Sequence, residues 1–570
     1  MKPRPPIGDG TPLPDFPGFR LPLPYPVFMM CRSLDHVRPI SGSRLMNSIL
    51  SRWLLALSVI CLANGSSSVW AEVQLAKVFS DHMVLQRDVP IPVWGWADPD
   101  EEVVVTLGEQ TRKTRADFIG EWGVKFDKLS VTGDSLTLVV QGKKPVTLKE
   151  ILVGEVWLCS GQSNMAMTVN RSRDYESEKK TADHPRLRMF TVKSGPATKP
   201  QQDCTGEWEV CTPETVGGFS ATGYFFGREL LQTLDVPVGL INSSVGGTGI
   251  EAWTSLDVQE ARPELAPIFE EWENRAKTYD PETATARFEK QMTAWKEAAR
   301  KARAEGKEPP RRPTEPVDPR LDRNHPANLF NGKIAPLIPF ALRGVIWYQG
   351  EHNARTVETA SLYRHQLPLL IEDWRDQWEQ GDFPFAWAQL PNFKRTTTEP
   401  QSVSEWATMR ESMSRSLSVP NTGMAVTIDV GEANDIHPKN KQDVGKRLAA
   451  WALAKVYKQG TPASGPVYAS HEFEDSRVVL RFDHLEGGLV ARGNNALKGF
   501  AIAGADKKWH WASAAIAGET VVVSHPSIAK PSAVRYAWGD NPACNLFNAV
   551  GLPAAPFRTD DWPHEPTASR

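Results

Sequence analysis

The chain has 570 residues, enough for two to four domains, and its 65 basic and 68 acidic side chains leave a formal charge of only −3. A charge so close to balance gives no indication of a polyanion-binding surface, so we expect no nucleic-acid partner. The 20 tryptophans are compatible with two alternatives: a cleft that stacks indole rings on sugars, or large β-rich cores.

The N-terminal segment is predicted to lie outside the mature protein. Residues 1–45 are rich in Pro and Arg without sustained periodicity and are interpreted as a non-native or disordered leader. Residues 46–71 have the pattern of a signal peptide, with Arg52 before an apolar run and a small residue at Ala71. That run is short for a bilayer span. We therefore expect export to the periplasm or the medium after cleavage near Ala71, with no membrane anchor in the mature form.

Residues 72–149 predict a small β-sandwich domain. Short β-like runs such as "HMVLQ", "EEVVVTLG" and "SLTLVVQG" alternate there with turns. The same patterning returns in residues 461–570, with "SRVVLRF" and "ETVVVSH", and predicts a C-terminal β-rich domain.

Residues 150–460 predict an α/β domain. The apolar runs "EVWLC", "VPVGLIN", "GVIWY" and "GMAVTIDV" are continuous rather than alternating, which is typical of parallel strands covered on both faces. Residues 258–320 interrupt this pattern as a helical insertion, with a charged amphipathic helix and a proline-rich connector. The insertion could shape a cleft or an interface.

Four cysteines follow residue 71. Cys204 and Cys211 flank "TGEWEV" and could close a small disulfide loop in an exported protein, whereas Cys159 is expected to be a buried small hydrophobe. The remaining one is Cys544. No pair has zinc-site spacing and no HExxH or EF-hand pattern occurs, so we expect neither a metal nor another cofactor.

Polar, glycine-bearing loops follow four apolar runs of the α/β region. They read "SGQSN", "SSVGGTGIEAW", "QGEHN" and "GEANDIHP". The carboxyl ends of parallel strands lie along one edge of the sheet, where ligands bind. We therefore expect the four loops to meet at one site.

The contents of these loops are those of a serine hydrolase. The Ser163 hydroxyl is a poor nucleophile without a base, and His437 could supply one near neutral pH. Asp435, two residues earlier, could orient the imidazole and stabilise its protonated form. The alternative for Asp435 and His437 is an ordinary role in capping the following helix.

Donors for a developing oxyanion are also available. Backbone N–H groups at Ser163 and in the Gly246-Gly247 loop, together with the Gln349 amide, could serve. Taken alone, a Gly-Gly turn has an ordinary structural explanation, and so has a Gln349 or Glu351 side chain that binds neighbouring backbone. Their convergence on one sheet edge favours a catalytic site.

The blocks "GQSNM", "SVGGTGIEAW", "GVIWYQGEHNA" and "NDIHPKNKQDVGKRLA" resemble those of the sialate O-acetylesterase family, a carbohydrate-esterase branch of the SGNH hydrolases. The likeness extends over about residues 72–562. It implies an SGNH or flavodoxin-like parallel-sheet core and cofactor-free removal of O-acetyl groups from an acetylated sugar or polysaccharide. The implied reaction passes through an acetyl-serine intermediate.

Position by position, the resemblance makes Ser163 the nucleophile, His437 the base and Asp435 its partner. It implies an oxyanion hole from Ser163, Gly247 and Gln349, with Gly246 and Asn353 as further candidates. Two positions depart from the family's pattern: Asn434 stands where the carboxylate would lie three residues before the histidine, and His352 where a smaller residue is expected.

The sequence leaves the substrate open. A sialate 9-O-acetylesterase-like activity, an acetylxylan or other polysaccharide acetylesterase and a non-catalytic carbohydrate-binding protein are the alternatives. A lipase is disfavoured because there is no GxSxG motif and the insertion is charged. Nothing in the sequence indicates the oligomeric state.

Overall fold

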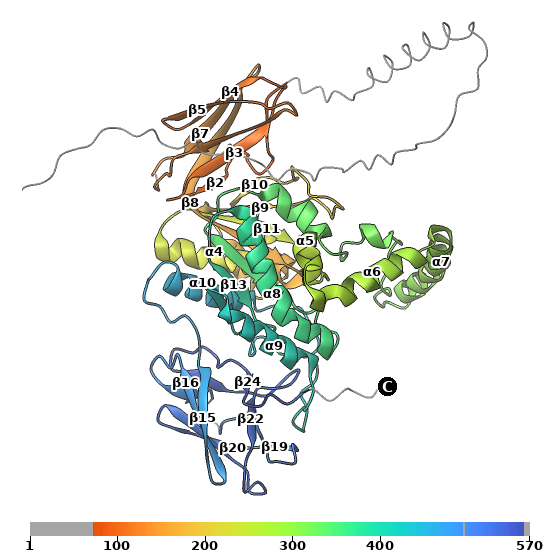
Figure 1. Cartoon of the computed structure of the whole chain (residues 1–570), viewed down its shortest axis with the longest axis vertical. Helices are drawn as coiled ribbons and strands as arrows, with labels where there is room; N and C mark the ends of the chain where they lie inside the picture. The colour runs from red at the N-terminus through yellow and green to blue at the C-terminus, as the bar shows by residue number, and fades with distance from the viewer. Residues whose placement is uncertain (1–71, 132, 494–495, 564–570) are drawn as a thin grey trace, which may run out of the picture.

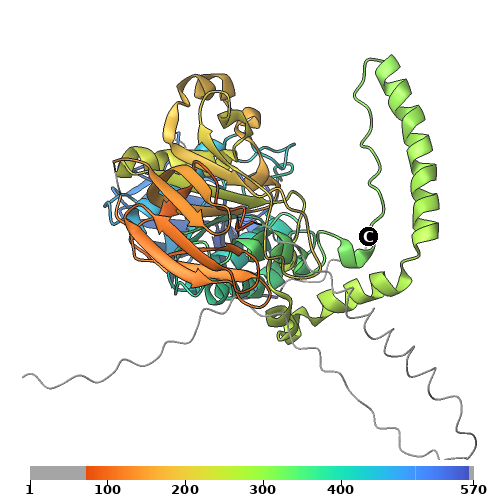
Figure 2. The same ribbon diagram turned by 90° about the horizontal axis from the view of Figure 1, so that it is seen from above.

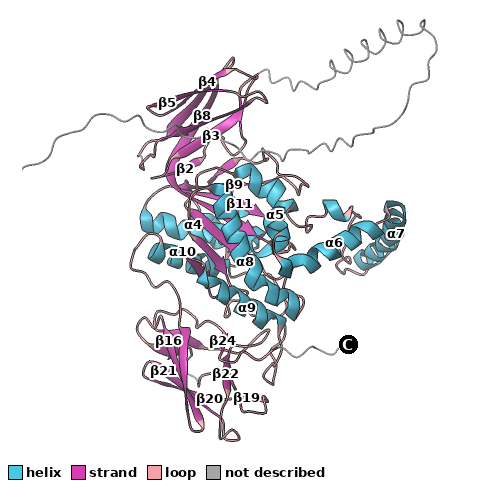
Figure 3. Cartoon of the chain, viewed as in Figure 1, coloured by secondary structure: helices cyan, strands magenta, loops and turns pink. Residues whose placement is uncertain are grey.

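The computed structural model describes residues 72–131, 133–493 and 496–563 (Figure 1). The predicted leader 1–45 and signal peptide 46–71 lie outside the described residues. The prediction of a mixed α/β architecture is confirmed, since a central region in which strands and helices alternate lies between two β-rich parts (Figure 3).

The first part of the described chain is made of short antiparallel strands. One sheet has the order β1-β3-β6, and β4 pairs with both β5 and β7. Buried and more exposed residues alternate along β4 and β6, so each has one face toward the core. The strands are β1 Gln74–Leu75, β2 Val84–Gln86, β3 Ile91–Trp96, β4 Glu102–Leu107, β5 Gln110–Arg115, β6 Glu121–Phe126 and β7 Leu136–Gln141.

One long strand, β8 (Val146–Gly161), connects this β-rich part to the central sheet. Its first half pairs antiparallel with β7, whereas residues 155–161 pair in parallel with β11 and 344–348 of β12. Burial changes with the pairing: the first half is partly exposed and the second half is fully buried. A strand buried on both faces is what its continuous apolar sequence predicts.

The central sheet has the order β10-β9-β11-β8-β12-β13-β14. All neighbours along this path are parallel except the β10–β9 pair, which is antiparallel at the edge. The strands are β9 His184–Thr191, β10 Trp208–Cys211, β11 Val238–Ser244, β12 Gly344–Tyr348, β13 Phe385–Ala388 and β14 Thr422–Ala425.

Helices cover both faces of the central sheet. Trp157 of β8 packs edge-on against Phe226 of α4, and Trp347 of β12 packs edge-on against Trp374 of α8. Since Trp157 is in register with Gly344, three residues before Trp347, the two indoles point to opposite faces. Helix α10 packs on α4 and α9 on α8. The helices are α4 Ala221–Leu234, α8 Val357–Trp378, α9 Glu405–Arg415 and α10 Lys441–Lys455.

The predicted helical insertion contains α5 (Leu256–Glu260), α6 (Ala266–Thr278) and α7 (Pro281–Ala304). Helices α6 and α7 project away from the body of the protein (Figure 2). Most of their side chains are exposed, which accounts for their charged composition, but Trp272 of α6 is buried. The face of α6 that carries Trp272 therefore packs onto the rest of the chain, where Trp272 contacts His325.

The C-terminal part consists of short antiparallel sheets with the orders β15-β16-β21-β20, β17-β23 and β19-β18-β22-β24. Buried charges join it to the central region, since Arg410 of α9 donates to the carbonyl oxygens of Gly539 and Asp540. The strands are β15 Val467–Glu474, β16 Arg477–Asp483, β17 Leu489–Ala491, β18 Phe500–Ala503, β19 Trp509–Trp511, β20 Ser513–Ala517, β21 Thr520–Ser524, β22 Ala533–Tyr536, β23 Leu546–Asn548 and β24 Phe557–Arg558.

Short helical segments occupy the loops between these elements. They are α2 Ser163–Ala166, η1 Val169–Arg171, α3 Tyr175–Thr181, η2 Val216–Gly218, η3 Ile250–Trp253, η4 Pro263–Leu265, η5 Pro319–Leu321, η6 Phe330–Ile334, η7 Ala335–Leu337 and η8 Ser416–Ser418. None of the helices in the described part of the chain combines the length and apolar character that a membrane span requires.

The cysteines correct one expectation and meet another. Cys204 and Cys211 do not close a disulfide loop; all four cysteines in the described ranges are free. Cys211 ends β10, where its thiol contacts the carbonyl oxygen of Ala182 at 3.5 Å, whereas Cys204 precedes the strand. Cys159 is buried inside β8, as expected, and burial raises the pKa of its thiol.

Candidate active site

Ser163 follows directly on the turn at the end of β8. Gly161 has φ +135°, and a Cβ there would fall 2.2 Å from the carbonyl oxygen of Tyr348, so the position requires glycine. The backbone N–H of Gln162 donates to that carbonyl at 2.9 Å and fixes the turn on β12. Ser163 then begins α2 with its side chain half-buried. The change from apolar strand to small polar residues thus ends the strand and leaves the serine accessible.

His437 reaches Ser163 from the loop between β14 and α10. Its Nε2 lies 2.9 Å from the Ser163 Oγ. Its Nδ1 lies 3.4 Å from Oδ1 of Asp435, which also accepts a hydrogen bond from the His437 backbone N–H at 2.9 Å. The side chain of Asp435 is 47% exposed and that of His437 33% exposed. The carboxylate therefore faces the imidazole from a partly solvated position.

The surroundings of His437 favour a neutral imidazole. Burial lowers its pKa below the ordinary 6.5; Asp435 acts in the opposite direction, and Lys441 and Arg171 add to the lowering. With the Nδ1 proton directed at Asp435, Nε2 is free to accept the proton of the Ser163 hydroxyl. This is the protonation state that a general base needs.

A buried hydrogen-bond network holds the serine and histidine segments together. Asn164, the residue after Ser163, donates through Nδ2 to the carbonyl oxygen of Ile436 at 3.0 Å. Ile436 is the residue before His437, so one amide side chain joins the segments that carry Ser163 and His437. Its Nδ2 also donates to Oε1 of Glu351, from the loop after β12.

Lys441 completes this network from the first turn of α10. Its Nζ donates to Oδ1 of Asn164 at 2.6 Å and to the carbonyl oxygen of Pro438 at 2.8 Å. The ammonium is fully buried, and burial lowers its pKa to about 7. Burial also raises the pKa of the Glu351 carboxyl. A buried lysine and carboxyl on either side of Asn164 fix the orientation of its amide.

The glycine loop after β11 lies against the serine. A Cβ at Gly246 would fall 3.3 Å from the Ser163 Cβ, and Gly247 has φ +72°. Each position therefore has its own reason to be glycine. Gly246 lets the backbone approach Ser163, and Gly247 turns the chain.

Gln349 connects the loops after β8, β11 and β12 through hydrogen bonds. Its buried Nε2 lies 2.7 Å from Oδ1 of Asn353, 3.0 Å from the carbonyl oxygen of Thr248 and 3.2 Å from Oε1 of Gln162. Its own Oε1 accepts from Tyr363 at 2.8 Å. Since an amide has two N–H groups, these protein acceptors already occupy both of them.

The amide of Asn353 also forms hydrogen bonds with protein groups. Its Oδ1 also accepts from the backbone N–H of Ile250 at 3.1 Å, and its Nδ2 donates to Oε2 of Glu251 at 2.9 Å. The side chains of Gln349 and Asn353 therefore join the loops after β11 and β12, and both N–H groups of the Gln349 amide are donated to protein acceptors.

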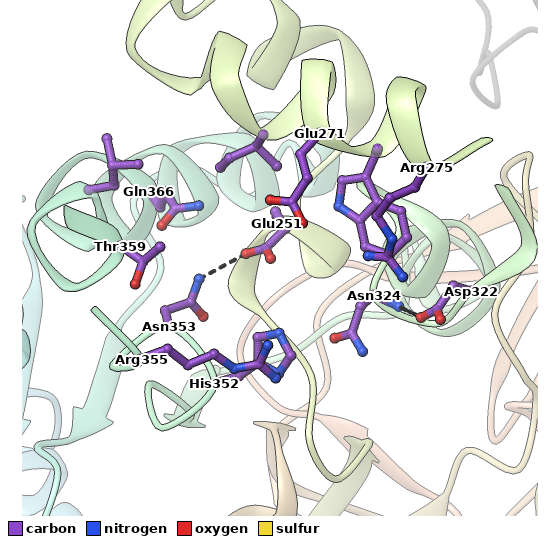
Figure 4. Close-up of a pocket in the computed structure, with 13 residues that line it drawn as sticks. Glu251, Glu271, Arg275, Asp322, Asn324, His352, Asn353, Arg355, Thr359 and Gln366 are labelled. Carbon is purple, nitrogen blue, oxygen red and sulfur yellow. Dashed lines mark hydrogen bonds between the residues drawn. The ribbon is translucent and has the colours of Figure 1, made fainter. Parts of the chain in front are cut away.

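His352, the second departure from the family pattern, lines a cavity beside α6 (Figure 4). Its backbone N–H donates to Oε1 of Gln162 at 3.3 Å, and its Nδ1 lies 3.0 Å from Nη2 of Arg355. Burial and the adjacent Arg355 lower the pKa of its imidazole to about 4. The ring is therefore neutral and accepts from the guanidinium.

The structure brings together every residue predicted for the site, at the carboxyl ends of β8, β11, β12 and beyond β14. Sequence reasoning missed the roles of Asn164, Lys441 and Glu351. The first two stand in motif blocks, but they are 277 positions apart and nothing in the spacing indicates that they touch. Within the described residues no group of three or more His, Cys, Asp or Glu side chains is arranged to hold a metal ion.

Comparisons with known proteins find relatives over most of this chain. The family model described as carbohydrate esterase, sialic acid-specific acetylesterase matches residues 153–302 and 330–454. The sialate O-acetylesterase of Mus musculus is 30% identical over 564 residues, covering 88% of this chain and 97% of its own. That of Homo sapiens is 29% identical over 552 residues, covering 88% and 95%. A crystal structure of a carbohydrate acetylesterase from Xanthomonas citri is 37% identical, with a TM-score of 0.73 over 86% of this chain and all of its own.

Proposed function

Because this chain belongs to the sialic acid-specific acetylesterase family of carbohydrate esterases, we propose that Ser163, His437 and Asp435 form the catalytic triad of a serine esterase. The protein is a carboxylic ester hydrolase that removes O-acetyl groups from carbohydrates. We further assign its central sheet to the SGNH type of hydrolase core.

The observation that supports the triad most directly is the 2.9 Å separation of the Ser163 Oγ and the His437 Nε2. In the proposed reaction His437 takes the hydroxyl proton as Oγ attacks the acetyl carbonyl carbon, and Asp435 stabilises the imidazolium. The tetrahedral intermediate collapses as His437 returns the proton to the departing sugar oxygen. Water, activated by the same imidazole, then hydrolyses the acetyl-serine and releases acetate.

For the oxyanion we propose the backbone N–H groups of Ser163 and Gly247 as the main donors. The close approach of Gly246 to Ser163 supports this choice. A hydrogen bond from Gln349 would require its Nε2 to leave the Thr248 carbonyl or Gln162. We therefore assign to Gln349, and to Asn353 beside it, the positioning of the glycine loop.

The substrate is an acetylated carbohydrate. The curated relatives are sialate O-acetylesterases, whereas the Xanthomonas citri protein is a carbohydrate acetylesterase, so a sialate and an acetylated polysaccharide are both candidates. Export to the periplasm or medium after cleavage near Ala71 remains part of the proposal. So does the division into a β-sandwich domain 72–149, a hydrolase domain 150–460 and a C-terminal β-rich domain 461–570.

The test compares acetate release by the wild-type protein and its Ser163→Ala variant, with 4-nitrophenyl acetate and acetylated glycans as substrates. Loss of a triad nucleophile lowers kcat by about six orders of magnitude, so the variant should be inactive on every ester. Ser177→Ala, at an exposed position on α3, is the matched control and should keep full activity. Persistent hydrolysis by a folded Ser163→Ala variant would refute the serine mechanism.

A further inference from the structure

The C-terminal β-rich part of the chain lies against the central region on the side of α9 (Figure 1). Its segment 539–541 meets the loop that follows β13, where the backbone N–H of Phe393 donates to the carbonyl oxygen of Asp540 at 3.1 Å. Fully buried Arg410 of α9 holds both segments, since it donates to the carbonyl oxygens of Leu390 and Asp540, each at 2.9 Å. The two segments are therefore fixed to each other.

A pair of asparagine side chains extends this contact toward the proposed catalytic site. Nδ2 of Asn392 donates to Oδ1 of Asn541 at 2.8 Å, and Nδ2 of Asn541 donates to the carbonyl oxygen of Lys394 at 2.6 Å. Oδ1 of Asn392 in turn accepts the backbone N–H of Gly431 at 2.8 Å. Gly431 belongs to the histidine loop, residues 426–440 between β14 and α10. One chain of hydrogen bonds therefore runs from the C-terminal part to the histidine loop.

The backbones of Gly431 and Asn392 approach too closely for a side chain to fit between them. A Cβ at Gly431 would fall 1.8 Å from the carbonyl oxygen of Asn392. The histidine loop can lie directly on Asn392 only because this position is glycine. A displacement of Asn392 would therefore displace Gly431 as well.

The following residues connect this contact with the proposed catalytic groups. Glu432 forms an isolated β-bridge with Asp435, and its Oε1 accepts the backbone N–H of Lys439 at 2.9 Å. These contacts close residues 432–439 into a compact loop that contains His437. Glu432 directly follows the glycine that is held by the asparagine pair, so the position of that glycine sets the position of the compact loop.

His437 is thus held from two sides. On one side Asn164, next to Ser163, donates to the carbonyl oxygen of Ile436 at 3.0 Å. On the other side the support comes through Asn392. The Ser163 Oγ and the His437 Nε2 are 2.9 Å apart, and a displacement of about 1 Å can lower a reaction rate about 100-fold.

We propose that the C-terminal β-rich part contributes to catalysis by positioning His437, with Asn541 acting through Asn392 on Gly431. The proposal rests on the esterase function above. Asn392 and Asn541 are positioning residues, since they act on the imidazole through the backbone of the histidine loop.

The first test is Asn392→Ala in the full chain, assayed with 4-nitrophenyl acetate. We expect kcat to fall about tenfold to a hundredfold with KM within about twofold, because a displaced imidazole slows proton transfer without weakening the binding of a small ester. The rate at which phenylmethanesulfonyl fluoride modifies Ser163 should fall in parallel, since it depends on the same serine–histidine pair. Asn274→Ala, at an exposed position on α6, is the matched control and should have wild-type kinetics.

The second test is a double-mutant cycle in kcat between Asn392 and Asn541. Asn541→Ala alone should lower kcat at least about threefold, yet have almost no further effect when Asn392 is already alanine, because its path to the histidine loop is then lost. Val523→Ala, in a buried position of β21, is the control for stability and should lower the Tm while leaving kcat unchanged. Should Asn392→Ala not fold, Asn541→Ala decides alone, since it leaves the loops of the central region intact.

The outcomes separate this inference from the esterase function. A folded Asn392→Ala variant, or an Asn541→Ala variant, with wild-type kcat would refute the positioning role, and so would effects of the two substitutions that multiply in full. A fall in kcat in Val523→Ala as large as that in Asn541→Ala would also refute it, because the C-terminal part would then contribute only stability. Hydrolysis that survives in Ser163→Ala, or is absent from the wild type on every ester, would refute the esterase function and this inference with it.

Discussion

The half-solvated position of Asp435 predicts a modest effect for Asp435→Asn. Its Oδ1 lies 3.4 Å from Nδ1 of His437. At that distance two unit charges attract by about 1 kcal/mol in a water-like dielectric and about 5 kcal/mol in an effective dielectric of about 20. Because the carboxylate is 47% exposed, solvent screening places the interaction near the lower value, about 1–2 kcal/mol.

This energy converts to a loss of about 5- to 30-fold in kcat/KM, far less than the loss of about 10⁴-fold known for a triad whose aspartate is buried. The pH profile should also move. Asp435 raises the pKa of His437 against the larger lowering by burial, so its removal lowers that pKa further. Since the base must be neutral to act, the acid limb of kcat/KM lies below pH 6.5 in the wild type and shifts to still lower pH in the variant.

The assay is hydrolysis of 4-nitrophenyl acetate between about pH 4.5 and 8, with the exposed neighbour Asn434→Ala as the matched control. A loss of about 10³-fold or more in kcat/KM would show that Asp435 acts as a desolvated triad member. That result would contradict the argument from its 47% side-chain exposure. A loss under about twofold would mean that another group orients the imidazole. An acid limb that moved to higher pH in the variant would refute the conclusion that Asp435 raises the pKa of His437.

Further predictions concern Lys441 and Gly161, which hold the candidate site in place, and the effect of removing metal ions. Lys441→Met removes the donor to Asn164 and should lower kcat at least about tenfold with the fold retained by circular dichroism, whereas the exposed Lys439→Met should match the wild type. Gly161→Ala should lower the free energy of unfolding by more than about 2 kcal/mol in urea titrations, because its Cβ would meet a backbone carbonyl of β12 at 2.2 Å; Gly195→Ala, with open space around it, should change it little. Treatment with EDTA should leave kcat within about twofold, since the serine–histidine pair needs no Lewis acid, and a metal-restorable loss of activity would contradict this.

The sequence by itself predicted the strands of the central sheet and pointed to Ser163 and His437 as the proposed reacting side chains. Continuous apolar runs such as that ending at Cys159 predict strands buried on both faces, and the structure has them at β8, β11 and β12. Polar loops after those runs predict convergence, because parallel strands end at one edge. Ser163 and His437 consequently lie within hydrogen-bond distance, although they are 274 positions apart.

Only the tertiary structure decided how these groups are held and what lies beside them. The contacts of Asn164 with Lys441, and the engagement of the Gln349 amide by protein acceptors, depend on side-chain directions that periodicity does not encode. The same is true of the cavity beside α6 (Figure 4), since its Glu271 belongs to a helix whose sequence indicates only a solvated face. Hydrophobic pattern specifies which face of an element is buried, whereas the docking of distant elements specifies which polar groups meet. In this protein the docking of distant elements determines the surroundings of Ser163.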